Sequence, residues 1–252
     1  MAEFPLDPPL AKMLIVSPQF NVAQEIVNLA AMLSVPLIFL RPKDAIREAD
    51  DAKAKFTHID GDHLTLLNVY NAYKTKQQRG EDIMSWCRNN FLNNRALKNA
   101  DDIREQLSQM LTKHNVKLNS TNVNSSAYSV NVRKCLIAGY FTHVAHLQRS
   151  GNYLTVKDMQ PILIHPSSCL DHKPDFCVYH EIVLTTKNYI RTCTEIKAEW
   201  LLEIQPDYFK PSKIKLMETR KELERAEKEL IEKRKKGKTD EGSKKKKFYF
   251  HE

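Results

Sequence analysis

A lysine, a tyrosine and an arginine alternate in the last third of the chain, at Lys187, Tyr189 and Arg191. Because the surrounding residues alternate with period two, we expect a strand here, with these three side chains on one of its faces. Ile190 and Ile196 would then lie on the opposite face. A cation, an aromatic ring and a second cation in a row can pair with phosphates and stack a base of a single-stranded nucleic acid. On the pattern alone, an ordinary exposed strand face is the simpler interpretation.

A second group of candidate residues is His58, Asp60, Asp62 and His63, which places four possible metal ligands within six residues. Ligands this close together rarely converge on one ion without a dedicated loop, and the D-x-D-x-D-G order of calcium loops is absent. Asp60-Gly61-Asp62 is instead typical of a turn in which Asp62 caps the following helix. We therefore expect a turn and a cap here, and not a metal site.

Cys169, His172, Cys177 and His180 form the pattern C-x2-H-x4-C-x2-H. Structural zinc sites usually have a longer spacer between their two ligand pairs. Cys177 and His180 also lie three residues apart on an expected strand, so their side chains would point to opposite faces. The sequence therefore predicts no metal ligands here.

Five cysteines, an odd number, lie inside segments of regular hydrophobic spacing. None is paired with a general base at a recognisable spacing, so we expect reduced, buried thiols and no catalytic residue. Reduced thiols favour an intracellular protein. The five are Cys87, Cys135, Cys169, Cys177 and Cys193.

Hydrophobic spacing predicts the elements that position these residues. The clearest helical stripe follows the turn and includes Leu64, Leu67 and Tyr70. Gly139, inside another predicted helix, would let a neighbouring helix approach closely. From residue 152 the period changes to two. We expect helices at 10–16, 22–33, 43–56, 62–73, 83–91, 100–114 and 127–147, strands at 153–156, 162–165, 176–184 and 188–196, and a closing helix at 197–204.

Charge is distributed unevenly along the chain. The net charge is +8, but residues 210–252 alone hold 16 basic and 9 acidic residues, a net of +7. Any nucleic-acid site in the remaining residues must therefore be local. In the basic segment, 213–236 reads as a solvated helix, and we expect the rest to be disordered. Its lysine and arginine runs, 233–236 and 244–247, solubilise the chain or direct nuclear import and polyanion binding.

Composition restricts the class of protein. At 42% hydrophobic and 28% charged residues, with only six glycines, the chain is typical of a helix-rich globular protein. No apolar run reaches about 18 residues, and the N-terminus lacks the pattern of a secretory signal. We expect no association with a membrane.

Three stretches resemble one family. His58-Ile-Asp-Gly-Asp-His63 with the following Leu-Thr-Leu-Leu-Asn-Val-Tyr, the stretch from Asn131 to Phe141, and the stretch from Leu184 to Thr194 are similar to the C-terminal region of DEAH-box RNA helicases. The resemblance covers roughly residues 1–210 and is nearest to the branch that acts in spliceosome disassembly and ribosome biogenesis.

The resemblance implies an α+β chain in which a helical bundle, the ratchet domain, precedes a small OB-fold barrel. It assigns residues 1–9 to the end of a winged-helix linker and 10–150 to the ratchet domain. It assigns 151–209 to the OB-fold, although about 60 residues is short for one, and it leaves 210–252 as a charged, largely disordered tail.

The resemblance also implies a function. In this family two motor domains bind ATP and Mg²⁺ and step along single-stranded RNA, which the helical and barrel domains enclose. This chain would grip RNA, contact the motor domains of its own polypeptide and dock activators such as G-patch proteins, in the nucleus and without DNA. The alternative is a stand-alone interaction module from a truncated helicase, which binds partners without RNA.

On this basis the barrel face at Lys187, Tyr189 and Arg191 becomes the preferred RNA site. His165 and Lys173 are loop candidates for the same path. Two further residues, Arg133 and Lys134, lie off the apolar stripe of their predicted helix, and surface charge and RNA contact are equally open for them.

We predict that the purified chain has no ATPase activity, because it contains neither a G-x-x-x-x-G-K-[ST] phosphate loop nor an Asp-Glu-Ala-His box. It should therefore hold no ATP or Mg²⁺ of its own. The measurement is steady-state ATP turnover with RNA present, which should equal that of buffer. Turnover that a substitution in this chain abolishes would contradict the prediction.

Overall fold

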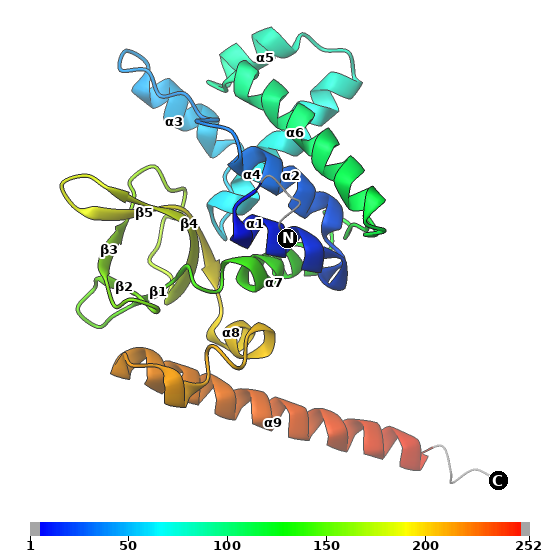
Figure 1. The fold of residues 1–252 in the computed structure, drawn as a ribbon, viewed down its shortest axis with the longest axis vertical. Helices are drawn as coiled ribbons and strands as arrows, with labels where there is room; N and C mark the ends of the chain where they lie inside the picture. Colours follow the sequence, from blue (N-terminus) through cyan, green and yellow to red (C-terminus); the bar gives the residue numbers. More distant parts are fainter. Residues whose placement is uncertain (1–5, 248–252) are drawn as a thin grey trace. The chain divides into compact units, whose positions relative to one another are not determined.

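The structure, a computed structural model, describes residues 6–247 (Figure 1). The helices are α1 (Pro8–Val16), α2 (Ala23–Leu33), α3 (Ile46–Ala54), α4 (Asp62–Gln78), α5 (Ile83–Asn89), α6 (Asn94–Lys113), α7 (Ala127–Tyr140), α8 (Ala198–Ile204) and α9 (Met217–Lys247), with short 3-10 helices η1 (Ser17–Phe20) and η2 (Pro211–Lys213). The strands are β1 (Val144–Leu147), β2 (Tyr153–Thr155), β3 (Pro161–Ile164), β4 (Phe176–Leu184) and β5 (Asn188–Ile196).

The described residues form two compact units, one that ends at Ile196 and one that begins at Lys197. The first unit contains helices followed by a five-stranded barrel, which confirms the expected α+β class. Within residues 6–247, no helix combines the length and the apolar character that crossing a bilayer requires.

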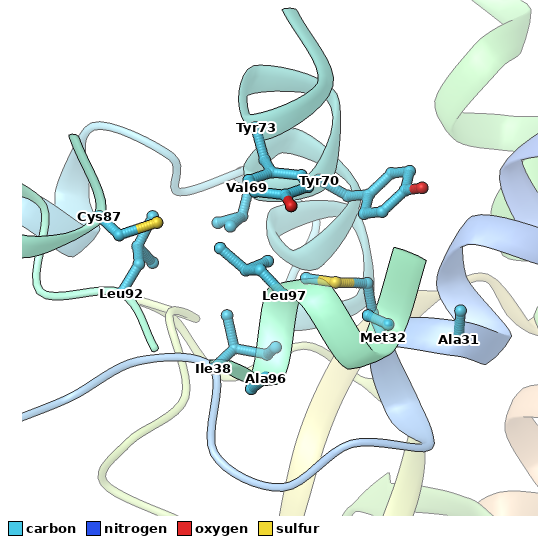
Figure 2. Close-up of a cluster of buried hydrophobic side chains, with 11 residues drawn as sticks. Ala31, Met32, Ile38, Val69, Tyr70, Tyr73, Cys87, Leu92, Ala96 and Leu97 are labelled. Atoms are coloured by element: carbon cyan, nitrogen blue, oxygen red, sulfur yellow. The ribbon is translucent and has the colours of Figure 1, made fainter. Parts of the chain in front are cut away.

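The helical part of the first unit packs around a core contributed by α2, α4, α5 and α6. Figure 2 shows Val69 and Tyr73 of α4 lying over Leu97 of α6 and Met32 of α2. These side chains are at most 2% exposed. The predicted stripe of α4 is therefore the central face of this bundle, where burial of each large side chain stabilises the fold by about 1.5–3 kcal/mol.

The five strands close into a barrel in the order β1-β2-β3-β5-β4. Neighbouring strands are antiparallel except β3 and β5, which are parallel. Side chains from alternate positions fill the interior of a small barrel. Here they include Ala145, Tyr153, Ile162, Cys177, Tyr179, Ile190 and Cys193.

The helix expected at 127–147 is wrong at its C-terminal end. α7 ends at Tyr140, and Val144–Leu147 is β1, the first strand of the barrel. Val144 and Leu147 continue the apolar spacing of the helix, so a prediction from periodicity alone made the helix too long. Because β1 lies between β2 and β4 and three of its four residues are buried, it shows no alternation that would identify it as a strand.

Two helix ends also differ from the prediction. α4 continues to Gln78, through residues expected to form a loop, and Lys74 in this extension pairs with Asp101 of α6 at 2.9 Å. α6 begins at Asn94 and not near residue 100, because the Asn93 side chain caps it by accepting from Ala96 N at 3.1 Å. The longer C-terminal end of α4 is therefore accompanied by a tertiary ion pair, and the earlier start of α6 by a side-chain cap.

Gly139 allows the close approach that the sequence predicted. A Cβ atom on Gly139 would lie 2.6 Å from the Pro9 carbonyl oxygen and 2.8 Å from Met13 Cβ. Both distances are shorter than side chains tolerate, so α1 and α7 pack at a separation that only glycine permits.

The second unit contains α8, η2 and α9. Trp200 and Leu201 of α8 are buried, as predicted. Leu223 and Ala226 of α9 are buried as well, so one side of the first half of α9 is packed, while most of the other side chains up to residue 235 are exposed, as expected for a solvated helix. α9 also continues to Lys247, past the predicted end at residue 236, and residues 248–252 lie outside the described part of the chain.

Three histidines cluster around Tyr140 where α4 and α7 contact the barrel. His63 is fully buried, with its Nδ1 2.8 Å from Thr194 Oγ1. Burial and, to a smaller extent, the neighbouring His180 lower the pKa of His63 from 6.5 to about 3. Burial likewise lowers the pKa values of His143 and His180. The folded state therefore favours neutral imidazoles at all three positions.

We predict that acid destabilises the protein partly through His63. The unfolded chain takes up a proton as the pH falls below about 6.5, whereas folded His63 stays neutral until about pH 3. Stability is thus fully present above 6.5 and is lost below it, by about 2 kcal/mol between pH 7 and pH 5 for this group. The measurement is the free energy of unfolding against pH for the wild type and His63→Asn.

The His63→Asn variant should be less stable at pH 7, because Asn leaves part of the buried site empty, but its stability should fall less steeply with acid. Equal pH slopes for the two proteins would contradict the prediction.

Candidate nucleic-acid interface

The hairpin of β4 and β5 presents the central residues of the predicted site. Leu184 pairs with Asn188 and Glu181 with Arg191, so the turn consists of residues 185–187. Ile190 is fully buried and Ile196 is 3% exposed, whereas Tyr189 and Arg191 are half-buried. The alternation expected for this strand is therefore present around Tyr189 and Arg191.

Lys187 is not on the strand, which corrects the prediction that all three residues share a strand face. β5 begins at Asn188, and Lys187 is exposed in the turn, where its carbonyl accepts from Thr185 N at 3.1 Å. The two-residue spacing from Lys187 to Tyr189 matched a strand, but the hairpin turn interrupts it. Lys187 therefore lies at the tip of the hairpin.

His165 joins Tyr189 through the parallel pairing of β3 and β5. His165 N donates to the Ile190 carbonyl at 3.0 Å. The His165 and Tyr189 rings meet edge to face, with centroids 5.5 Å apart and planes at 79°. Ser167 orients the imidazole, with its Oγ 2.7 Å from Nδ1. The structure thus brings the strand candidate and the loop candidate into one aromatic pair.

Arg191 and Lys53 place positive charge beside this aromatic pair. Arg191 lies opposite Glu181, with an N–O distance of 3.8 Å, which is a loose ion pair on a partly exposed surface. Lys53 of α3 donates to the Ser167 carbonyl and lies 5.1 Å from the centroid of the Phe39 ring. Sequence reasoning missed Lys53, because it looks like any charged residue of an amphipathic helix.

The electrostatic surroundings of His165 favour the neutral ring. Burial lowers its pKa first, followed by the charge of Arg191, and Lys53 lowers it further, while Asp62 and Glu181 raise it. A neutral imidazole can stack or donate one hydrogen bond without adding to the repulsion among neighbouring cations. We define His165, Tyr189, Arg191 and Lys53 as the barrel face.

The structure does not bring Lys173 to the barrel face. Its Nζ donates to the Gly151 carbonyl at 3.1 Å, in the turn between β1 and β2. Within the described residues, the Lys173 ammonium therefore bonds to the turn between β1 and β2 and not to His165 or Tyr189.

Arg133 is buried, which corrects the expectation that it lies off the packed face of its helix. It is 7% exposed and its Nη1 lies 3.0 Å from Asp60 Oδ1. The same nitrogen is 3.4 Å from the Glu195 carbonyl. Its guanidinium therefore holds the helices to β5, and we leave it out of the barrel face. The neighbouring Lys134 is half-buried.

The turn at residues 58–63 joins the helical part to the barrel. Gly61 forms an antiparallel bridge with Thr194, and Glu195 N donates to the Asp60 carbonyl at 2.8 Å. β3 pairs with β5 at Tyr189 and Ile190, so the turn covers the same strand further along. This segment adds a short piece of strand to the barrel.

Asp62 does not cap its own helix, contrary to the prediction. The N-cap of α4 is Gly61, with no side-chain cap, and the Asp62 carboxylate faces the barrel. It accepts from Ser168 Oγ at 2.7 Å and from the backbone N–H groups of Cys169 and Cys193, both at 2.8 Å. Asp62 thereby fixes the loop that carries His165 and the strand that carries Arg191.

No group of three histidine, cysteine, aspartate or glutamate residues within the described chain is placed to hold a metal ion. In the C-x2-H-x4-C-x2-H stretch, Cys177 points into the barrel core, while the His180 ring bonds to the Tyr140 hydroxyl at 2.8 Å. In the turn, Asp60 pairs with Arg133 and His63 lies against Thr194, so these side chains point in different directions.

We predict that Gly61→Ala destabilises the protein by about 3–5 kcal/mol, from backbone strain and overpacking together. Gly61 has φ of 130°, and an added Cβ would lie 2.6 Å from Thr194 Cα. Gly80→Ala is the matched control, because Gly80 also has positive φ, 67°, but no atom within 4 Å of the added Cβ. It should cost only about 1–2 kcal/mol. The measurement is denaturant unfolding of both variants, and equal losses would contradict the prediction.

Two family models match separate parts of the chain. Residues 7–66 match the model described as "Helicase associated domain (HA2), ratchet-like", and residues 132–208 match the model described as "Oligonucleotide/oligosaccharide-binding (OB)-fold". The first match ends in α4, just after the turn at residues 58–63, and the second contains the whole barrel. The chain therefore combines a ratchet-like helicase-associated domain with an OB-fold, the pair of domains typical of the C-terminal region of DEAH-box helicases.

Proposed function

We propose that this chain is the accessory C-terminal part of a DEAH-box RNA helicase and that its barrel face grips single-stranded RNA. The observation that carries the proposal is the aromatic pair of His165 and Tyr189 on an OB-fold, with Arg191 and Lys53 beside it. Rings bind bases of any sequence by stacking, and nearby cations bind the phosphates between them.

In this proposal Tyr189 is the stacking platform and His165 supports its ring from the edge. Arg191 reaches a phosphate by exchanging its loose contact with Glu181, and Lys53 reaches the next from the helical side. The chain contributes binding and no bond-breaking chemistry, so ATP and Mg²⁺ belong to motor domains of the same polypeptide.

The wider role follows from the same proposal. The grip on RNA would serve ATP-dependent remodelling in pre-mRNA splicing, at spliceosome disassembly, and in ribosome biogenesis. This places the protein in the nucleus, with the basic runs at 233–236 and 244–247 as the import signal. Docking of activating proteins of the G-patch type is the second part of the role. Support for these points comes from the sequence resemblance, whereas the two domain matches support the accessory helicase role in general.

The test is the affinity of the full chain for a fluorescent oligouridylate at several salt concentrations. Tyr189→Ala should lose about 1–3 kcal/mol of binding free energy, nearly independently of salt. Arg191→Ala and Lys53→Ala should each lower the slope of log K against log salt by about 0.7, the contribution of one phosphate on a single strand. Lys187→Ala, at the hairpin tip, should have a smaller effect.

Two controls make this test specific. Tyr189→Phe keeps the ring and should bind like wild type, and Lys113→Ala removes an exposed charge from the last turn of α6. Melting temperatures of all variants should stay within a few degrees of wild type. If the barrel-face variants bind RNA like wild type, or if their losses follow lowered melting temperatures, the face is structural and the alternative of a protein-interaction module without RNA is favoured.

A further inference from the structure

An open apolar groove of about 430 Å³ lies on the helical part, between the segment that precedes α3 and the end of α5. Cys87 and Leu92 contribute to it, and Figure 2 shows these two side chains close together at the edge of the helical core. Leu40, Pro42 and Phe91 supply the rest of its apolar lining. No residue of the barrel face lines this groove.

Phe91 is held in a backbone conformation that glycine normally adopts. Its φ is 51°, in the left-handed region. Phe91 N donates to the Arg88 carbonyl at 3.2 Å and Leu92 N to the Cys87 carbonyl at 2.9 Å, which is the bonding pattern of a Schellman helix end. An L side chain in this conformation costs about 1–2 kcal/mol. Such outliers concentrate at binding sites, and here the strained residue places an aromatic ring in the groove.

The charges that line the groove are positive. Arg41 and Arg88 line it, and among the lining residues of the described chain none is acidic. Arg88 is exposed. Arg41 makes a two-bond contact with Asp50 at 2.7 and 2.8 Å, but both side chains are more than half exposed, so water or another carboxylate competes for it.

Exposed apolar side chains continue beyond the groove in the sequence. Leu37 and Met84 are 66% and 62% exposed, and Ile46 is 40% exposed. Leu37 lies shortly before the lining residue Leu40 in the sequence, and Met84 lies one helical turn before Arg88 on α5. Leu37 and Met84 thus lie close along the chain to lining residues, and exposed apolar side chains beside arginines are typical of a surface that binds protein.

We infer that this groove docks an acidic peptide segment of a partner protein, which inserts one aromatic or branched aliphatic side chain beside Phe91. Carboxylates that flank this anchor would pair with Arg88 and Arg41. The inference rests on the docking role proposed above and gives that role a location and a chemistry. It does not depend on RNA binding by the barrel face.

The probe is a short fluorescein-labelled peptide in which aspartates and glutamates surround one phenylalanine and one leucine, titrated with the full chain in fluorescence anisotropy. Phe91→Gly should weaken binding about tenfold or more, because it removes the ring while relieving the backbone strain. Arg88→Glu should weaken binding at least about fivefold and reverse its salt dependence. Arg95→Glu, an exposed arginine in the first turns of α6, is the matched charge control and should bind like wild type.

Two further controls separate this inference from the proposed RNA grip. Tyr189→Ala should bind the peptide like wild type, and Arg88→Glu should bind oligouridylate like wild type. No peptide binding at about 1 mM, equal binding of a peptide with lysines in place of its acidic residues, or unchanged binding by Arg88→Glu would overturn the inference. The inference would also be overturned if oligouridylate displaced the peptide from the Tyr189→Ala variant. If Phe91→Gly is unstable, Arg88→Glu decides alone, because its side chain is exposed.

Discussion

The buried carboxylate of Asp62 connects the helical part of the chain to the barrel. It accepts one hydroxyl and two backbone N–H groups, all from the barrel and its loops, while it sits in the first turn of α4. Hydrogen bonds to a charged group contribute about 1.5–3 kcal/mol each, and a buried carboxylate without them would be strongly destabilising. The two parts are therefore held in one arrangement by a contact that tolerates little displacement.

This contact also decides how the barrel face is built. The loop that begins at His165 is fixed at Ser168 and Cys169 by Asp62, and at Ser167 by Lys53, so helical residues hold both sides of it. Tyr189 and Arg191 come from β5, whose later residues bond to the turn before α4. The stacking ring and its cations thus keep their spacing only while the helices and the barrel stay docked. This is the kind of preorganisation that binding sites require.

The spacing of apolar residues predicted those features of the fold that depend on neighbouring residues in the sequence. The bounds of β4 and β5 and the burial of Ile190 and Ile196 follow from alternation, and the stripe of α4 follows from helical spacing. Long-range contacts were not predictable in this way. Arg133 and Asp62 look like a surface cation and a helix cap, yet both are bound across the sequence to β5. β1 has no alternation because it is buried on both faces, and nothing local distinguishes Lys53. The contacts of these residues depend on which helices and strands pack against each other, and hydrophobic periodicity carries no information about that packing.

The contact of Gly61 with β5 constrains how the sequences of such proteins can evolve. Since the space beside Thr194 admits no side chain at residue 61, the turn and the strand constrain each other's substitutions. A chimaera that exchanged only the barrel between two relatives would separate surfaces that were fitted together. A break in the segment of 114–126 that links α6 to α7 would cut these same contacts, and this segment is itself hydrogen-bonded to Pro18 and Asn21 through Asn119 and Thr121. The two domains of the first unit are therefore expected to be inherited as one module, although their folds are separate.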